Sequence, residues 1–136
     1  VYGELHSQFA CQLLNELCLS QRSTFVHLGC GFGKLVTQAA MQTGCRSYGI
    51  ESQPALWAEA VALAQAARQR CQRASALLGP LIIEHAEIFN GIHVQRCMEV
   101  ADVVFINNQG FVQSVNARIY QELFPILKRG AVVITT

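Results

Sequence analysis

A glycine-rich turn lies between two segments of different pattern near the start of the chain. The turn H-L-G-C-G-F-G at 27–33 continues the β-rich run T-F-V-H-L at 24–28, and residues 35–42 then suit a helix. Glycine lets a backbone approach a ligand closely, and the start of a helix offers unpaired N–H groups. The order strand, turn, helix therefore predicts a ligand cradle, although the glycines alone are equally compatible with a plain tight turn.

An acidic residue stands at a spacing typical of nucleoside sites. Glu51 follows Gly31 by 20 positions and ends a predicted strand, R-S-Y-G-I-E at 46–51. A carboxylate there can accept hydrogen bonds from both hydroxyls of a ribose. Alone, Glu51 also fits a solvated cap on the next helix. Together with the turn it predicts nucleoside binding, and we expect it to face a cleft and to support no core packing.

Polar residues also follow the third and fourth predicted strands. Glu87 comes after L-I-I-E at 81–84, where it would reach the adenine edge of a bound nucleoside, and an exposed loop acid explains it equally well. Asn107 and Asn108 directly follow the apolar run D-V-V-F-I at 102–106. Two uncharged amides at the end of a buried strand suit the binding of a polar group better than an ordinary turn.

The elements that must position these residues alternate along the chain. Strands are predicted at 25–28, 47–50, 81–84, 102–106 and 131–135, and helices at 7–19, 35–42, 52–78 and 118–127. In the first helix Phe9, Leu13, Leu14 and Leu17 share one face, and Ser52 is the expected N-cap of the long alanine-rich helix. This alternation predicts an α/β fold with a parallel sheet covered on both faces. We expect the glycine turn and Asn107 to share one edge of that sheet.

Composition narrows the class of protein. The chain has 136 residues, of which 51% are hydrophobic and 14% charged, so it suits one folded domain and is not disordered as a whole. No apolar run approaches the roughly 20 residues of a membrane-spanning helix, and no targeting peptide is visible, which favours an excised piece. Six cysteines without a C-x-x-C pair favour free thiols in a reducing compartment and no metal site.

The charge balance bears on nucleic-acid binding. Ten Lys and Arg residues stand against nine Asp and Glu, which gives a net charge of +1 and no basic footprint for DNA. Arg68, Arg70 and Arg73 fit a solvated helix face better than a phosphate-binding one. We therefore expect DNA contact only through segments outside this chain.

Four segments together resemble one protein family. V-Y-G-E at 1–4, the glycine turn, Y-G-I-E at 48–51 and D-V-V-F-I-N-N-Q-G-F at 102–111 are similar to the DOT (disruptor of telomeric silencing) family, the histone H3 lysine methyltransferases without a SET domain. The resemblance implies a Rossmann-like, seven-strand-type S-adenosylmethionine methyltransferase fold, here partial, with five strands visible. It implies that residues 1–136 are an incomplete catalytic core that acts on a lysine of nucleosomal histone H3 in the nucleus.

The resemblance also implies which residues bind the methyl donor. Gly29 and Gly31 would lie against its methionine part, and Glu51 would bind its ribose. Glu87 would face the adenine amine where the family usually has Asp, beside Ile88 where the family has Phe.

Further residues would surround the reacting groups. Asn107 would bind the donor and line the channel that meets the target lysine, with Phe111 in the apolar wall of that channel. Tyr2 and Glu4 would belong to the loop that flanks the donor pocket. The resemblance implies direct in-line methyl transfer to a neutral amine, for which no general base is nominated.

Two positions in the turn depart from the family pattern. His27 replaces an Asp that helps to hold the donor's ammonium group; a protonated imidazole would repel that group, and a neutral one only partly replaces the carboxylate. Lys34 replaces Gln or Asn and is placed to pair with the donor's carboxylate. Three alternatives stay open: a methyltransferase with another substrate, a non-catalytic module that has lost the donor, and a nicotinamide-dependent oxidoreductase, which the glycine spacing disfavours.

Overall fold

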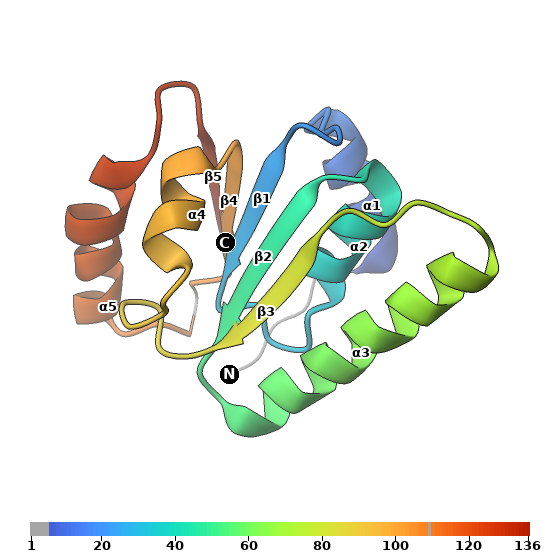
Figure 1. Cartoon of the computed structure of the whole chain (residues 1–136). Helices are drawn as coiled ribbons and strands as arrows, with labels where there is room; N and C mark the ends of the chain where they lie inside the picture. Colours follow the sequence, from blue (N-terminus) through green and yellow to red (C-terminus); the bar gives the residue numbers. More distant parts are fainter. Residues whose placement is uncertain (1–5, 109) are drawn as a thin grey trace.

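Five parallel strands form the centre of the molecule. The computed structural model describes residues 6–108 and 110–136, so the predictions for Tyr2 and Glu4 lie outside the described residues. The strands are β1 (Thr24–Leu28), β2 (Arg46–Glu51), β3 (Leu81–His85), β4 (Val103–Ile106) and β5 (Val132–Thr135). Their order across the sheet is β3-β2-β1-β4-β5, with every pair parallel (Figure 1). The five predicted strands and the α/β architecture are confirmed.

Helices cover both faces of this sheet. Figure 1 shows α1 (Ser7–Glu16), α2 (Lys34–Thr43) and α3 (Pro54–Arg73) on one side and α4 (Val94–Val100) and α5 (Gln113–Arg118) on the other. A π-helical turn, η1 (Ile119–Leu123), and a 3-10 turn, η2 (Phe124–Ile126), continue α5. The first three predicted helices are present, although α1 ends at Glu16 rather than at residue 19. The α-helix predicted at 118–127 instead ends at Arg118, where η1 and η2 follow it, and α4 is an additional helix. Among the described residues no helix is both long and apolar enough to cross a membrane.

Three further details of the predicted helices are wrong. The N-cap of α3 is Gln53 rather than Ser52, because Pro54 takes the first helical position and holds the residue before it extended. The same helix ends at Arg73, before a left-handed residue, Ser75, with φ of 52°. Phe9 is 54% exposed, because the residues of α1 that are buried are Ala10 and Leu14.

Strand β1 separates two apolar clusters. All five of its residues are buried. Phe25 packs into the cluster under α1, α2 and α3, whereas Val26 and Leu28 belong to the cluster under α4 and α5. This alternation follows from the two-residue period of a strand. His27 therefore points to the same face as Phe25, which places its imidazole inside the α1–α2 side of the protein.

The order of the strands across the sheet changes direction at β1. β1 pairs with β2 on one side and with β4 on the other, so its carboxyl end opens onto the point where ligands bind in such sheets. The N–H groups of Gly29 and Cys30 both donate to the Ile50 carbonyl at 2.9 Å, which fastens the glycine turn to the end of β2. Leu28 is in register with Ile106, so the turn and Asn107 share one edge, as predicted.

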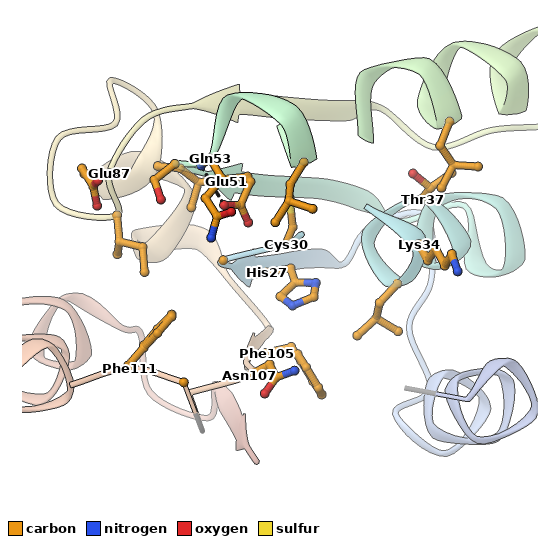
Figure 2. A pocket seen from close by; sticks show the side chains of 18 of the residues that line it. His27, Cys30, Lys34, Thr37, Glu51, Gln53, Glu87, Phe105, Asn107 and Phe111 are labelled. Carbon is orange, nitrogen blue, oxygen red and sulfur yellow. Dashed lines mark hydrogen bonds between the residues drawn. The ribbon is translucent and has the colours of Figure 1, made fainter. Parts of the chain in front are cut away.

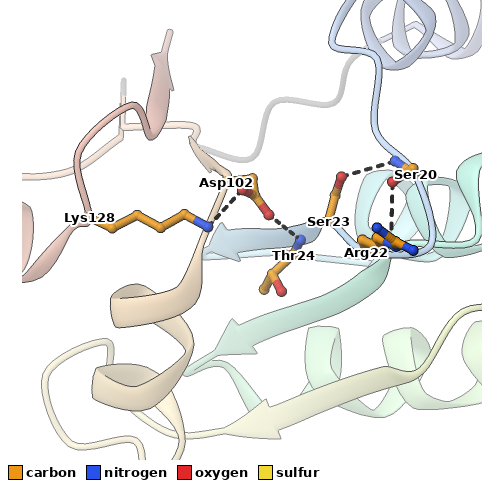
Figure 3. Close-up of polar contacts among 6 residues, drawn as sticks. All are labelled: Ser20, Arg22, Ser23, Thr24, Asp102 and Lys128. Carbon is orange, nitrogen blue, oxygen red and sulfur yellow. Dashed lines mark hydrogen bonds and ion pairs between the residues drawn. The ribbon is translucent and has the colours of Figure 1, made fainter.

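Asp102 joins three strands at the opposite edge (Figure 3). Its Oδ2 accepts the Thr24 N–H at 2.8 Å, and its Oδ1 lies 2.8 Å from Lys128 Nζ. Its carbonyl accepts the Val132 N–H at 2.9 Å. Partial burial raises the pKa of Asp102, but the hydrogen bonds from Lys128 and Thr24 outweigh that effect and hold the pKa below its usual value.

The Asp102→Ala variant should lower the free energy of unfolding by about 1–3 kcal/mol, because the buried Thr24 N–H loses its acceptor. The matched control is Lys128→Met, which removes only a half-exposed ion pair and should cost at most about 1 kcal/mol. Urea denaturation followed by circular dichroism measures both. Equal losses in the two variants would contradict the role assigned to the Thr24 hydrogen bond.

Candidate functional site

A cavity of about 1320 Å³ opens at the carboxyl edge of the sheet. Its wall includes residues of β1, β2 and β4 and of the loops that follow these strands. Figure 2 shows Glu51 and Gln53 close to Cys30, with His27 below them and Asn107 beside Phe105. Eight of the predicted site residues line its wall, and Gly31 does not: His27, Gly29, Lys34, Glu51, Glu87, Ile88, Asn107 and Phe111.

The glycine turn has a backbone that other residues would not adopt. Gly33 caps α2 with φ of 75°, and a Cβ there would lie 2.8 Å from the Cβ of Ala60 on α3. Gly29 has φ of 73°, and a Cβ there would lie 3.2 Å from the ring of Phe111. The turn is thus pressed against a helix on one side and an aromatic ring on the other. Phe111 forms part of the cavity wall directly above the turn.

Glu51 holds the turn in place. Its side chain is buried; Oε2 accepts the Gly31 N–H at 2.8 Å and Oε1 accepts the Gln53 N–H at 2.9 Å. Besides facing the cavity, as expected, this acid fixes the turn and the residue that caps α3. An ionised carboxylate has about four acceptor positions. Two are used by these backbone groups, so the same side chain has capacity for two hydroxyl donors in the cavity.

His27 is the unusual residue of the wall. It is 6% exposed, and its ring packs edge-to-face on Phe105 with centroids 4.9 Å apart. Neither ring nitrogen has a hydrogen-bond partner among the described residues. Burial lowers the pKa of His27 to about 3, so the imidazole is neutral at pH 7. Burial therefore favours the neutral imidazole over the imidazolium at this position.

The segment after β4 is tied down by its amides. Asn107 Oδ1 accepts the Thr136 hydroxyl at 2.9 Å, and Asn108 Nδ2 donates to Asn116 Oδ1 on α5 at 3.1 Å. The backbone N–H of Phe111 donates to the Asn108 carbonyl at 3.1 Å. These bonds hold a half-buried Asn107 at the cavity wall, where its amide can contact a polar group.

The remaining predicted residues differ in burial. Glu87 is exposed in the loop after β3, and Ile88 beside it is half-buried. Lys34 is exposed at the first position of α2. Within the described part of the chain, no three His, Cys, Asp or Glu side chains are grouped to hold a metal ion. Outside the cavity, Arg68 donates to the Leu81 carbonyl at 2.7 Å instead of facing only solvent.

Some residues of the cavity were not predicted. Arg118 lies over the ring of Phe89, with 3.9 Å from its guanidinium carbon to the ring centroid, and forms a two-bond pair with Glu122. Arg118 and Phe89 both line the cavity, as do Phe105 and Thr37. Strand alternation would have placed Phe105 on one face of the sheet, but nothing in the sequence pairs it with His27.

Comparison with known proteins identifies the family. The model of the family described as "Histone methylation protein DOT1" matches residues 1–136, the whole chain. The chain belongs to the DOT1 family. DOT1 relatives named "Histone-lysine N-methyltransferase, H3 lysine-79 specific" are 38% identical over 98% of the chain in Cryptococcus neoformans var. neoformans serotype D and 31% identical over 99% in Chaetomium globosum. The chain spans only 21% and 26% of the lengths of these two DOT1 relatives.

Solved structures agree with the fold of this DOT1 chain. An RNA methyltransferase from Salinibacter ruber in complex with S-adenosyl-L-homocysteine superposes with a TM-score of 0.73 at 23% identity, covering 98% of this chain and 76% of the other. A SAM-dependent methyltransferase from Thiobacillus denitrificans gives 0.67 at 15% identity over 99% of this chain and 50% of the other. The Rossmann-like methyltransferase fold predicted from the sequence is confirmed.

Stability should depend on pH through His27. In the unfolded chain His27 binds a proton below the ordinary histidine pKa of 6.5, whereas folded His27 stays neutral down to about pH 3. The free energy of unfolding should therefore fall as the pH falls below 6.5, by up to about 1.4 kcal/mol per pH unit from this residue. Urea denaturation of the parent and of His27→Phe between about pH 7 and pH 5 isolates the effect. Parallel slopes in the two proteins would show that His27 is not neutral in the folded state.

Proposed function

We propose that the chain is the donor-binding catalytic core of an S-adenosylmethionine-dependent lysine N-methyltransferase that acts on a core-surface lysine of nucleosomal histone H3 in the nucleus. The observation that carries the proposal is the bond from Gly31 N–H to Glu51, which joins the glycine turn to the acid at the edge of the cavity. The family match over residues 1–136 and the names of the relatives support the histone substrate.

The cavity residues fit an adenosyl amino acid. Glu51 has acceptor capacity for the two ribose hydroxyls, and the positions of Glu87 and Ile88 on the same wall suit the adenine. Gly29 lines the cavity beside the Phe111 ring, where the methionine part would lie against the backbone of the turn. A volume of about 1320 Å³ leaves room for a ligand of this size together with a substrate side chain.

The chain's own groups would orient the reaction rather than move protons. S-Adenosylmethionine supplies an electrophilic methyl group when it is bound. Asn107, held by Thr136, would position the approaching lysine amine through its amide, and Phe111 would keep water from that approach. The rate enhancement then comes from proximity and alignment in a site that excludes water. Cys30 is not a nucleophile in this scheme, because burial raises the pKa of its thiol to about 12.

Isothermal titration calorimetry with S-adenosylhomocysteine and NAD tests the proposal. Binding of the first and not the second is expected. A nicotinamide-dependent oxidoreductase would give the reverse, and a folded module that has lost its donor would bind neither. Incorporation of labelled methyl groups into nucleosomes and into free histone H3 then separates a nucleosomal substrate from another one.

The Glu51→Ala variant should weaken binding of S-adenosylhomocysteine at least about tenfold, because hydrogen bonds to a charged acceptor are worth roughly 1.5–3 kcal/mol each. It should also lower the melting temperature, since the N–H groups of Gly31 and Gln53 lose their acceptor. Glu51→Gln keeps one acceptor and should lose less on both counts. Glu87→Gln is the matched control, an exposed acid of the same wall, and should leave the melting temperature unchanged. Unchanged affinity in Glu51→Ala would disprove the donor site.

Nucleosome methylation by the chain should be weak and should increase when a basic segment is attached. Phosphate contacts dominate affinity for DNA-bearing partners, and a net charge of +1 releases few counterions. Activity of the fusion should fall steeply between about 50 and 200 mM salt, whereas a fusion with a neutral segment of equal length should behave like the parent. Equal activity in the basic and neutral fusions would contradict the argument.

A further inference from the structure

The loop after β3 forms one wall of the cavity. It joins β3 to α4 over residues 86–93 (Figure 1). Four consecutive residues of this loop line the cavity: Glu87, Ile88, Phe89 and Asn90. A backbone bond from the Asn90 N–H to the Glu87 carbonyl, at 2.9 Å, closes the turn between them. Both of these residues are exposed, so the turn needs anchors on either side if its side chains are to keep one position.

The loop is anchored at its two ends by different groups. At its start, the Ala86 N–H donates to the backbone carbonyl of Glu51 at 3.2 Å. At its end, the carboxylate of Glu84 accepts the Ile92 N–H at 2.5 Å and lies 3.4 Å from the His93 N–H. Glu84 belongs to β3 and is not part of the described cavity wall. Its influence on a ligand therefore passes through the loop that it holds.

The position of the Glu84 carboxylate is set by the core. Its Oε2 accepts the hydroxyl of Tyr48 at 2.7 Å, and Tyr48 is only 2% exposed. Burial and this hydrogen bond raise the pKa of Tyr48, so its hydroxyl stays a donor. Gly91 packs against the same groups, because a Cβ there would lie 2.9 Å from Glu84 Oε2 and 2.6 Å from Ile50 Cδ1. The end of the loop is thus fitted to a carboxylate whose own place is fixed.

We propose that Glu84 is a positioning residue that sets the preference of the cavity for adenine, because it holds the loop where the carboxylate of Glu87 meets the base. This inference rests on the proposed function, which puts the adenine beside Glu87 and Ile88. The adenine amine donates to a carboxylate, whereas hypoxanthine has a carbonyl oxygen at that position, and two acceptors repel each other. Hypoxanthine carries its donor on the neighbouring ring nitrogen, which Glu87 meets only if the loop moves. The preference for adenine over hypoxanthine therefore reports the position of the loop.

Calorimetry with S-adenosylhomocysteine and S-inosylhomocysteine, which differ only in the base, measures this preference. The parent chain should bind the adenine ligand at least about tenfold more tightly. Glu84→Ala releases the N–H groups of Ile92 and His93 and should reduce the ratio of the two affinities to about threefold or less. A loss of stability alone would leave this ratio unchanged in a folded variant, so the ratio distinguishes positioning from a purely structural role.

Two further variants separate the length of the side chain from its charge. Glu84→Asp keeps the charge but is one methylene shorter, so it must release the loop or draw it toward β3, and the ratio should fall as in Glu84→Ala. Glu84→Gln keeps the length; its amide oxygen can accept the Ile92 N–H and its NH₂ group can donate to the oxygen of Tyr48. The ratio in Glu84→Gln should therefore stay within about twofold of the parent.

Tyr48→Phe is the matched control. It removes the phenol bond to Glu84 and leaves the bonds from the loop N–H groups in place, so it should lower the melting temperature without changing the ratio of affinities. Circular dichroism reports whether each variant is folded. A ratio that fell in Tyr48→Phe as far as in Glu84→Ala would assign the effect to the packing of the sheet and overturn the role of the loop bonds.

The remaining outcomes separate this inference from the proposed function. If the folded parent chain does not bind S-adenosylhomocysteine, both are wrong. If the parent binds both ligands equally, or if folded Glu84→Ala and Glu84→Asp keep the parent ratio, only the role of Glu84 is overturned. Because Glu84→Asp retains a carboxylate beside Tyr48, the comparison stays decisive even if Glu84→Ala does not fold.

Discussion

The buried carboxylate of Glu51 is the interaction on which the candidate site depends. It accepts the Gly31 N–H at 2.8 Å and the Gln53 N–H at 2.9 Å, so one side chain fixes both the glycine turn after β1 and the residue before α3. Both backbone donors lie outside the strands, and a side chain satisfies them where the sheet's own hydrogen bonds have ended. The acid is therefore structural before any ligand arrives, and the cavity is formed around a group with acceptor capacity to spare.

The amino and carboxyl ends of the strands have different roles. At the amino ends of the strands, Asp102 uses both carboxylate oxygens to join the first residue of β1 and the loop before β5. At the carboxyl edge, Glu51 and the turn leave a cavity rather than closing it. Parallel strands make this division possible, because all their carboxyl ends lie together, and polar loop residues gather there without entering the apolar clusters.

His27 shows how one buried group alters a site without altering the fold. Its ring packs on Phe105 as an apolar residue would, and burial keeps it neutral. The ring therefore packs within β1, a fully buried strand, without disturbing the sheet. What it changes is the wall of the cavity, which has a neutral donor and acceptor at this position.

The sequence by itself determined the strands, the order of elements and several residues of the cavity wall, because these follow from local patterns (buried apolar runs, glycines before a helix, polar residues where strands end) and from the family resemblance. It placed His27, Glu51 and Asn107 at one sheet edge correctly. Only the tertiary structure decided that Glu51 holds backbone groups, that His27 is neutral against Phe105, and that Arg118 lies over Phe89 at the same wall. Those facts depend on burial and on contacts between distant segments, and neither is encoded in the spacing of residues along the chain.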